Sequence, residues 1–240
     1  MQYFNQFNTL LYKFGDEVDT VLFQDLTSYV EVIDQIKDNI SAYQYEYILD
    51  GWRPDHVSLK FYGTPKYHWT FFVLNDKLKF QGWPLTNKEL ISVIDKEFSN
   101  TVITTRDVMT GLFKVGQVIT GSVSGTTGKI IHRNPNFGTL TIEGTKTFNS
   151  DEAINATVDG VDQVVTLVAS TTEKDAVHHY ENASKEWVDI TPSAAVGAGI
   201  TPVTNAEYYI AQNDNLRTIK IINPRLIDQE VTAYKQGIAS

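Results

Sequence analysis

The chain changes character twice along its length, and this change constrains the fold more than any other feature of the sequence. Residues 1–109 are rich in aromatic and charged side chains, and residues 173–240 return to a mixed, helix-compatible sequence. Between them, residues 110–172 are rich in Gly, Thr, Ser, Val and Ile and carry few charges. Short β-branched runs separated by glycine turns are typical of a small barrel or sandwich. We therefore expect an inserted all-β domain at 110–172.

The spacing of apolar residues predicts helices in the flanking segments and strands throughout, so the fold class we expect is α+β. Pro54 and Pro65 suit the first turns of two short helices. Thr86 with Glu89, and Thr204 with Glu207, form capping boxes that would start two further helices. The predicted helices cover 26–40, 56–62, 66–75, a segment after 86, 205–214 and a segment after 223; the predicted strands cover 43–49, 117–120, 129–132, 138–142, 161–168 and 217–222.

Composition excludes several classes of protein. The sequence has no cysteine, which rules out disulfide scaffolds, cysteine-ligated zinc, iron–sulfur clusters and thiol catalysis. Its formal net charge is -9, and an acidic surface repels phosphate backbones, so we expect no nucleic-acid partner. No apolar run approaches the roughly 18 residues of a membrane span. Residues 1–6 lack the basic start and apolar core of a signal peptide, so we expect a soluble product made in the cytoplasm, with no membrane partner.

Motifs that carry chemistry are mostly missing from the sequence. The five histidines form no H-E-x-x-H pattern, and the segment 125–130 lacks the spacing of a phosphate-binding loop. His178 and His179 are adjacent, and on a regular strand they would point to opposite faces and could not chelate one ion together. We expect no enzyme activity, metal or cofactor. A hydrolase centred on Asp175, His178, His179 and Glu181 is the alternative, and it requires those groups to line a cleft with shifted pKa values.

One segment carries a family resemblance. Residues 47–55 read Tyr-Ile-Leu-Asp-Gly-Trp-Arg-Pro-Asp, and the pattern continues through 59–65, 67–69, 74–76 and 82–85. This stretch resembles the baseplate wedge protein of T-even-like contractile-tailed bacteriophages, in a unit that is similar to a LysM module. Residues 3–12 and 204–220 also resemble that family, so the resemblance covers about 1–109 and 175–240. The block at 110–172 departs from the family pattern.

The resemblance implies a fold and a function. It implies an N-terminal arm and helix at 1–42, a LysM-like βαα(β) module with a following helix at 43–109, and a C-terminal α/β segment at 173–240 that packs with the N-terminal part; the inserted β domain at 110–172, which composition predicts, lies between the last two. It implies a structural protein of the virion tail that is present in several copies within a symmetric hexameric baseplate. Its partners would be other wedge proteins and the tail hub and tube proteins.

Aromatic residues make up 12% of the chain, and Trp, Tyr and Arg are enriched where proteins bind each other tightly. Trp69, Phe72 and Leu74 are expected in the core, although Trp83 could also belong there. The alternative function is a LysM-type module that binds peptidoglycan or chitin in a groove near Trp52, Tyr67 and Trp83. The expected protein-contact residues are Trp52, Arg53, Tyr67, His68, Trp83 and Tyr208.

Overall fold

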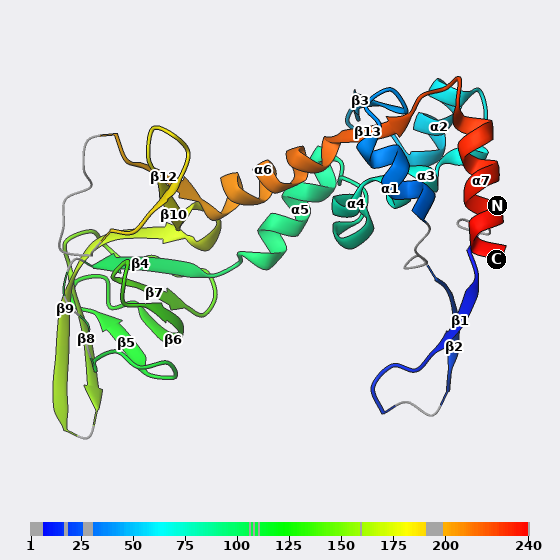
Figure 1. Cartoon of the computed structure of the whole chain (residues 1–240). Coiled ribbons are helices and arrows are strands. Elements are labelled where there is room, and N and C mark those ends of the chain that lie inside the picture. Colours follow the sequence, from blue (N-terminus) through cyan, green and yellow to red (C-terminus); the bar gives the residue numbers. More distant parts are fainter. Residues whose placement is uncertain are drawn as a thin grey trace. The chain divides into compact units, whose positions relative to one another are not determined.

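The computed structural model describes residues 7–16, 19–25, 31–105, 107, 109, 111–158, 160–190 and 199–239. It is a mixed α+β protein, as the sequence predicts. The chain forms two compact units (Figure 1). Unit 1 is assembled from residues 1–87 and 212–240, and unit 2 from residues 88–211. Unit 2 is therefore wider than the predicted β domain at 110–172, and residues 173–211 belong to it.

Unit 1 is built from small helices around a two-stranded sheet, in which β3 pairs antiparallel with β13. Its core contains Ile48, Phe71 and Ile221 on one side, and Trp69 and Tyr234 on another. The elements are β1 (Thr9–Tyr12), β2 (Val21–Gln24), α1 (Glu31–Asp38), β3 (Tyr43–Tyr47), α2 (Pro54–Tyr62), the 3-10 turn η1 (Pro65–Tyr67), α3 (Thr70–Leu74), α4 (Asp76–Gln81), β13 (Thr218–Ile222) and α7 (Ile227–Ala239).

The predicted continuous helix over 66–75 is wrong, because the structure divides this segment into η1 and α3. A side chain takes a backbone group that a continuous helix would use. The hydroxyl of Thr70 donates to the Tyr67 carbonyl at 2.7 Å, and the Phe71 amide, which would use that carbonyl in a continuous helix, instead donates to the His68 carbonyl at 3.4 Å. Such local side-chain bonds compete with helical hydrogen bonding. The short helix α4, which follows directly, was not predicted.

Side chains close the outer edge of β13. The side-chain nitrogen of Asn75, Nδ2, donates to the carbonyls of Lys220 and Phe71, each at 2.8 Å. The Lys220 amide in turn donates to the Asn75 side-chain oxygen at 2.8 Å, and the Tyr62 hydroxyl donates to the Ile222 carbonyl at 3.0 Å. Because an open strand edge can pair with another chain, these bonds remove one site of unwanted association.

The main part of unit 2 is a closed barrel with the strand order β4-β7-β6-β5-β8-β9. Its interior is filled by apolar side chains that include Phe113, Ile119, Ile130, Leu140 and Ile154. The strands are β4 (Thr101–Thr105), β5 (Val118–Gly121), β6 (Thr127–Asn134), β7 (Thr139–Ile142), β8 (Ala153–Val158) and β9 (Val161–Thr172).

Two barrel strands were missed in the sequence, and the barrel begins before residue 110. β4 is buried almost throughout, so it lacks the alternation that marks a half-buried strand. β8 contains alanine and asparagine, which are depleted in strands, so its pattern is weak. The predicted strands at 117–120, 129–132, 138–142 and 161–168 correspond to β5, β6, β7 and β9.

A buried carboxylate holds the loops at one end of the barrel. Glu152 is 2% exposed, and its two oxygens accept hydrogen bonds from the amides of Val123, Ser124 and Asn149 and from the Ser124 hydroxyl, at 2.7 to 2.9 Å. A side chain on Gly121 would come within 2.7 Å of both carboxylate oxygens and would displace them from these hydrogen bonds.

The rest of unit 2 is a three-stranded sheet with the order β11-β10-β12 and adjoining helices. The second predicted capping box is confirmed, since the Glu207 amide donates to the Thr204 hydroxyl at 3.2 Å and the Thr204 amide donates to the Glu207 carboxylate at 2.8 Å. The elements are α5 (Asn87–Glu97), η2 (Glu173–Asp175), β10 (Val177–Glu181), β11 (Trp187–Val188), β12 (Thr201–Thr204) and α6 (Asn205–Arg217), whose last residues belong to unit 1.

Candidate functional site

The most unusual surface of unit 1 is the hairpin formed by β1 and β2, drawn in blue in Figure 1 and called here the apolar hairpin. Its register pairs Leu10 with Phe23, Leu11 with Leu22, and Tyr12 with Val21. Within the part of the chain that the structure describes, these strands pair only with each other. Nearly every residue of the two strands is exposed.

Both faces of the apolar hairpin carry exposed hydrophobic side chains, although one of them also carries the polar pair Thr9 and Gln24. Side chains alternate between faces along a strand, and paired residues share a face. One face therefore carries Leu10, Tyr12, Val21 and Phe23, and the other carries Leu11 and Leu22, which are 67% and 63% exposed. On the first face the ring of Tyr12 lies edge-on to Phe23, with ring centres 6.3 Å apart.

An isolated two-stranded hairpin is at best marginally stable in water, and contiguous exposed apolar surface marks interaction sites. The apolar hairpin thus has the properties of a segment that becomes covered. Sequence reasoning expected an extended N-terminal arm here but did not predict the pairing of two strands or name these residues as contacts, although a signal was present. Leu10-Leu11-Tyr12 and Val21-Leu22-Phe23 are unbroken apolar runs, which are typical of strands that are buried on both faces.

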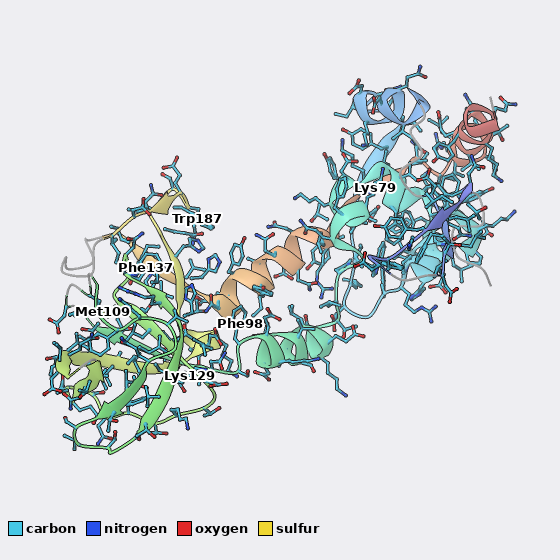
Figure 2. The ribbon with its side chains drawn as sticks, turned by 90° about the horizontal axis from the view of Figure 1, so that it is seen from below. Lys79, Phe98, Met109, Lys129, Phe137 and Trp187 are labelled. Atoms are coloured by element: carbon cyan, nitrogen blue, oxygen red, sulfur yellow. The ribbon has the colours of Figure 1, made fainter. Side chains whose placement is uncertain are left out.

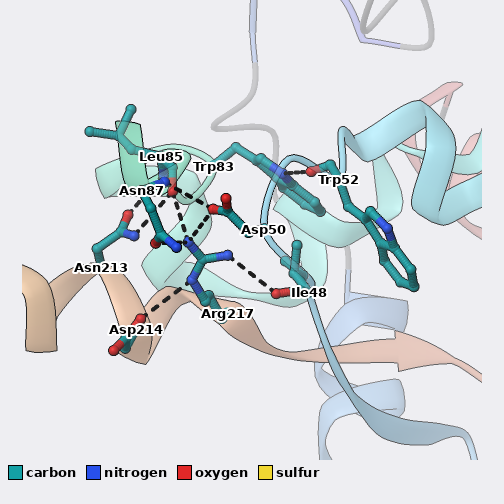
Figure 3. Close-up of polar contacts among 9 residues, drawn as sticks. All are labelled: Ile48, Asp50, Trp52, Trp83, Leu85, Asn87, Asn213, Asp214 and Arg217. Carbon is teal, nitrogen blue, oxygen red and sulfur yellow. Dashed lines mark hydrogen bonds and ion pairs between the residues drawn. The ribbon is translucent and has the colours of Figure 1, made fainter. Parts of the chain in front are cut away.

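The predicted contact residues Trp52 and Trp83 lie together. The indole nitrogen of Trp83 donates to the Trp52 carbonyl at 2.7 Å (Figure 3). The half-buried ring of Trp83 packs against Phe72, with ring centres 5.8 Å apart. The half-buried ring of Trp52 lies under the Lys60 ammonium, which is 4.0 Å from the ring centre. Both indoles therefore serve the packing of unit 1 with at least one face.

His68 is only 4% exposed, so the prediction that it forms a surface contact is corrected: it is a core residue. Its Nδ1 lies 2.9 Å from the Pro65 carbonyl, since the turn η1 folds the imidazole back on its own backbone. Arg53 stays exposed, with its Nε 3.3 Å from an Asp55 oxygen. The Tyr67 hydroxyl donates to the Asp228 carboxylate on α7, and this bond, followed by burial, raises the pKa of Tyr67.

The core predictions for Trp69 and Leu74 are confirmed, since both are buried, whereas Phe72 is half-buried. The ring of Trp69 lies between Phe7 and Tyr234, with ring centres 5.6 and 5.1 Å away. This contact joins the described start of the chain to helix α7.

A buried arginine that the sequence did not single out as a site holds the two stretches of unit 1 together (Figure 3). The guanidinium of Arg217, which is 4% exposed, donates to the Asp50 carboxylate and to the Leu85 carbonyl, each at 3.0 Å. It also donates to the Ile48 carbonyl at 3.4 Å, and its Nε lies 3.4 Å from Asp214. This arrangement is structural, because every group that faces the guanidinium belongs to the protein's own framework.

The last predicted contact residue, Tyr208, stacks on a histidine of unit 2. Its ring is 4.0 Å from that of His178, with 11° between the planes. The prediction that His178 and His179 point to opposite faces is wrong, because their Nδ1 atoms are 2.9 Å apart. The reason is an irregularity in the pairing of β10 with β12 between Val177 and His179. An extra residue in a strand breaks the alternation of its side chains.

The hydrolase alternative receives partial geometric support. Glu181 lies 3.2 Å from the Nε2 of His179, but the Asp175 carboxylate instead accepts a hydrogen bond from Thr172 at 2.5 Å. No group of three or more His, Asp or Glu side chains suited to a metal occurs among the described residues.

Surface pockets occur in both units. One, of about 320 Å³ in unit 1, is lined by Lys37, Lys77 and Lys220 together with Asp76. The other, of about 270 Å³ in unit 2, is lined by residues that include His132, Glu173 and His178. Neither is lined by the aromatic residues of the predicted sugar groove.

Comparison of the chain with protein-family models and with curated proteins gave no match. None of the helices described in the structure has both the length and the apolar character needed to cross a membrane.

Proposed function

We propose that this protein is a non-enzymatic structural component of a phage tail baseplate wedge, which binds other wedge proteins and helps join wedges around the central hub and tube. The resemblance of residues 47–85 to the wedge family supports this proposal. The observation that carries it is the apolar hairpin, which exposes hydrophobic side chains on both faces.

Binding is the work that such a hairpin can do. Burial of apolar surface stabilises an association by roughly 25 cal/mol per Å² of area removed from water. Aromatic residues such as Tyr12 and Phe23 are enriched at the centres of interfaces. Because both faces are apolar, a partner must cover both, so we expect the hairpin to insert into a partner rather than to lie on a flat surface.

The test is co-purification of the full chain with neighbouring candidate wedge proteins, followed by measurement of mass by light scattering. We expect a stoichiometric complex with the wild type. The variant with Leu11→Lys and Leu22→Lys should lose it, because two charges would have to be buried. A matched control places lysines at Ile91 and Val93, which are exposed apolar residues of α5. That control should retain the complex.

Two outcomes would contradict the proposal. One is a complex that survives the hairpin variant and is lost in the α5 control. The other is a chain that stays alone with every wedge protein and instead binds chitooligosaccharide, which would favour the carbohydrate-binding alternative.

A further inference from the structure

A compact cluster of aromatic rings in unit 2 surrounds two adjacent histidines, called here the histidine pair (His178 and His179). Trp187 of β11, labelled in Figure 2, stacks on His179 with ring centres 4.2 Å apart and 23° between the planes. Tyr208 of α6 stacks on His178 at 4.0 Å. The histidine pair therefore links β10 to a neighbouring strand on one side and to the first turns of a helix on the other.

The contact inside the histidine pair depends on the number of protons it holds. The two Nδ1 atoms are 2.9 Å apart, which is a hydrogen-bond distance. A neutral imidazole has one N–H donor and one acceptor nitrogen, whereas a protonated imidazole has two donors. One Nδ1 must carry a proton and the other must not. If both rings were protonated, two N–H groups would face each other, and two positive charges would be adjacent.

The charged and titratable groups around the pair compensate a positive charge on His179 better than one on His178. Glu181 lies 3.2 Å from the Nε2 of His179, and the Lys185 ammonium is 3.2 Å from the other Glu181 oxygen. His178 faces the Tyr208 ring and the pocket that His132 and Glu173 also line. The Glu173 carboxylate already accepts hydrogen bonds from Asn100 at 2.8 and 3.2 Å.

We propose that the histidine pair is a proton-operated latch, which holds β11 and the start of α6 against β10 while the pair carries a single proton at its Nδ1 contact, and which opens when both rings are protonated. With one ring protonated the contact still has a donor and an acceptor; the last proton enters from solvent at the accepting Nδ1, two N–H groups then face each other, and the pair separates. The stacked contacts with Trp187 and Tyr208 then loosen. This inference rests on unit 2 alone and does not depend on the wedge assignment.

The titration of the neighbouring groups agrees with this direction. Burial, followed by the positive charge that His179 can carry, lowers the pKa of His178 below its ordinary 6.5. A histidine with a lowered pKa contributes stability that is present above 6.5 and is lost as the pH falls. The hydrogen bonds from His179 and Lys185 lower the pKa of Glu181 below 4.5, so Glu181 remains charged while His178 titrates.

The contact can be tested directly in the full-length wild-type protein by ¹⁵N NMR of the imidazole rings. At pH 8 we expect one Nδ1 of the pair to have the shift of a protonated nitrogen and the other that of an acceptor nitrogen. Two Nδ1 atoms that are both protonated at pH 8, or both unprotonated, would overturn the proposal.

The opening is tested by amide hydrogen exchange at pH 7.5 and pH 5.5, corrected for the intrinsic dependence on pH. We expect protection to fall by up to about tenfold in β11 and the first turns of α6, because at pH 5.5 protonation of an open form with an ordinary histidine pKa near 6.5 can favour opening by about that factor. Protection in the barrel strands β8 and β9 should not change.

Variants separate the latch from a general effect of acid. His178→Phe keeps a flat ring on Tyr208 but cannot titrate, so the change between the two pH values should disappear. His132→Gln alters an exposed histidine that lines the same pocket, so the change should remain. A change that persists in His178→Phe, or one that is lost equally in His132→Gln, would overturn the proposal, as would its absence in the wild type.

Discussion

At the scale of single residues, the side chains of Arg217 and Asn75 each connect separate segments of unit 1 through hydrogen bonds. Arg217 contacts residues from both stretches of the unit, and its partners include the backbone carbonyls of Ile48 and Leu85. A buried charge of this kind is costly to leave without partners, so its geometry matters as much as its charge.

Arg217→Lys should therefore lower the free energy of unfolding of unit 1 by about 2–4 kcal/mol, because a lysine keeps the charge but cannot reach all the acceptors. Denaturant unfolding measures this effect. The control Arg53→Lys changes an exposed arginine and should shift stability by less than about 0.5 kcal/mol. Equal effects of the two variants would show that the buried network does not stabilise the unit.

Asn75→Asp tests the closed edge of β13. A carboxylate can still accept from the Lys220 amide, but it cannot donate to the Lys220 and Phe71 carbonyls. We expect a loss of about 2–3 kcal/mol at pH 7, which should shrink in acid as the new carboxyl regains a proton. Asn215→Asp, at an exposed position on α6, is the control and should have little effect. A loss at Asn75 that does not depend on pH would contradict this account.

At the scale of elements, local pattern predicts some structures well and others poorly. Strand β3 and the strand before α7 follow their sequence periodicity. The prediction of one helix over 66–75 was wrong because the Thr70 hydroxyl takes the Tyr67 carbonyl that the Phe71 amide would use, and the spacing of apolar residues does not report such a bond. Strand β4 was not predicted because it is buried almost throughout, and strand β8 was not predicted because it contains residues that are depleted in strands. The predicted orientation of His178 and His179 was wrong because the strand has an irregularity in its pairing, which the alternation of residues in the sequence does not reveal.

The candidate site could be predicted only in part for similar reasons. Residue type alone favoured Trp52, His68 and Trp83 as contacts, but residue type does not reveal which side of a short helical turn faces the core. The apolar hairpin had a readable signal in its two unbroken apolar runs. That signal indicates burial, and nothing in the sequence says that the burial must come from another molecule.

Glu152→Gln tests how one side chain supports the loops of the barrel. Burial raises the pKa of Glu152, but the hydrogen bonds from Ser124, Val123 and Asn149 outweigh burial and leave the pKa below 4.5. The glutamine places a donor against amide donors, so we expect a loss of about 1–3 kcal/mol at pH 7. Denaturant unfolding, with the exposed Glu143→Gln as the control, measures this loss.

The same comparison has a predicted dependence on pH. A carboxyl group with a lowered pKa contributes stability that is present above 4.5 and is lost as the pH falls. The difference in stability between the wild type and Glu152→Gln should therefore narrow below pH 4.5. A difference that stays constant down to pH 3 would show that the ionised carboxylate is not what holds the loops.

At the scale of the whole molecule, the division into two units predicts which regions a destabilising substitution affects. The Arg217 network lies within unit 1, and the Glu152 network lies within unit 2. Sites that share no partners usually contribute additively to stability. Each substitution should thus reduce hydrogen-exchange protection in its own unit.

The double variant with Arg217→Lys and Glu152→Gln checks this expectation. Its changes in protection should equal those of the two single variants, region by region, within about 0.5 kcal/mol. A larger deviation, or loss of protection in the barrel caused by Arg217→Lys alone, would show that the two units unfold as one.

The apolar hairpin also has a consequence for its own geometry. In most hairpins a slip of one residue moves the hydrophobic side chains to the wet face, and this penalty fixes the alignment of the strands. With apolar residues on both faces, such a slip exchanges one hydrophobic surface for another. In the free protein, neighbouring alignments of the two strands should therefore have similar free energies. The pairing of Leu11 with Leu22 would then be selected by whatever encloses the two strands. Recognition and the final step of folding would be the same event.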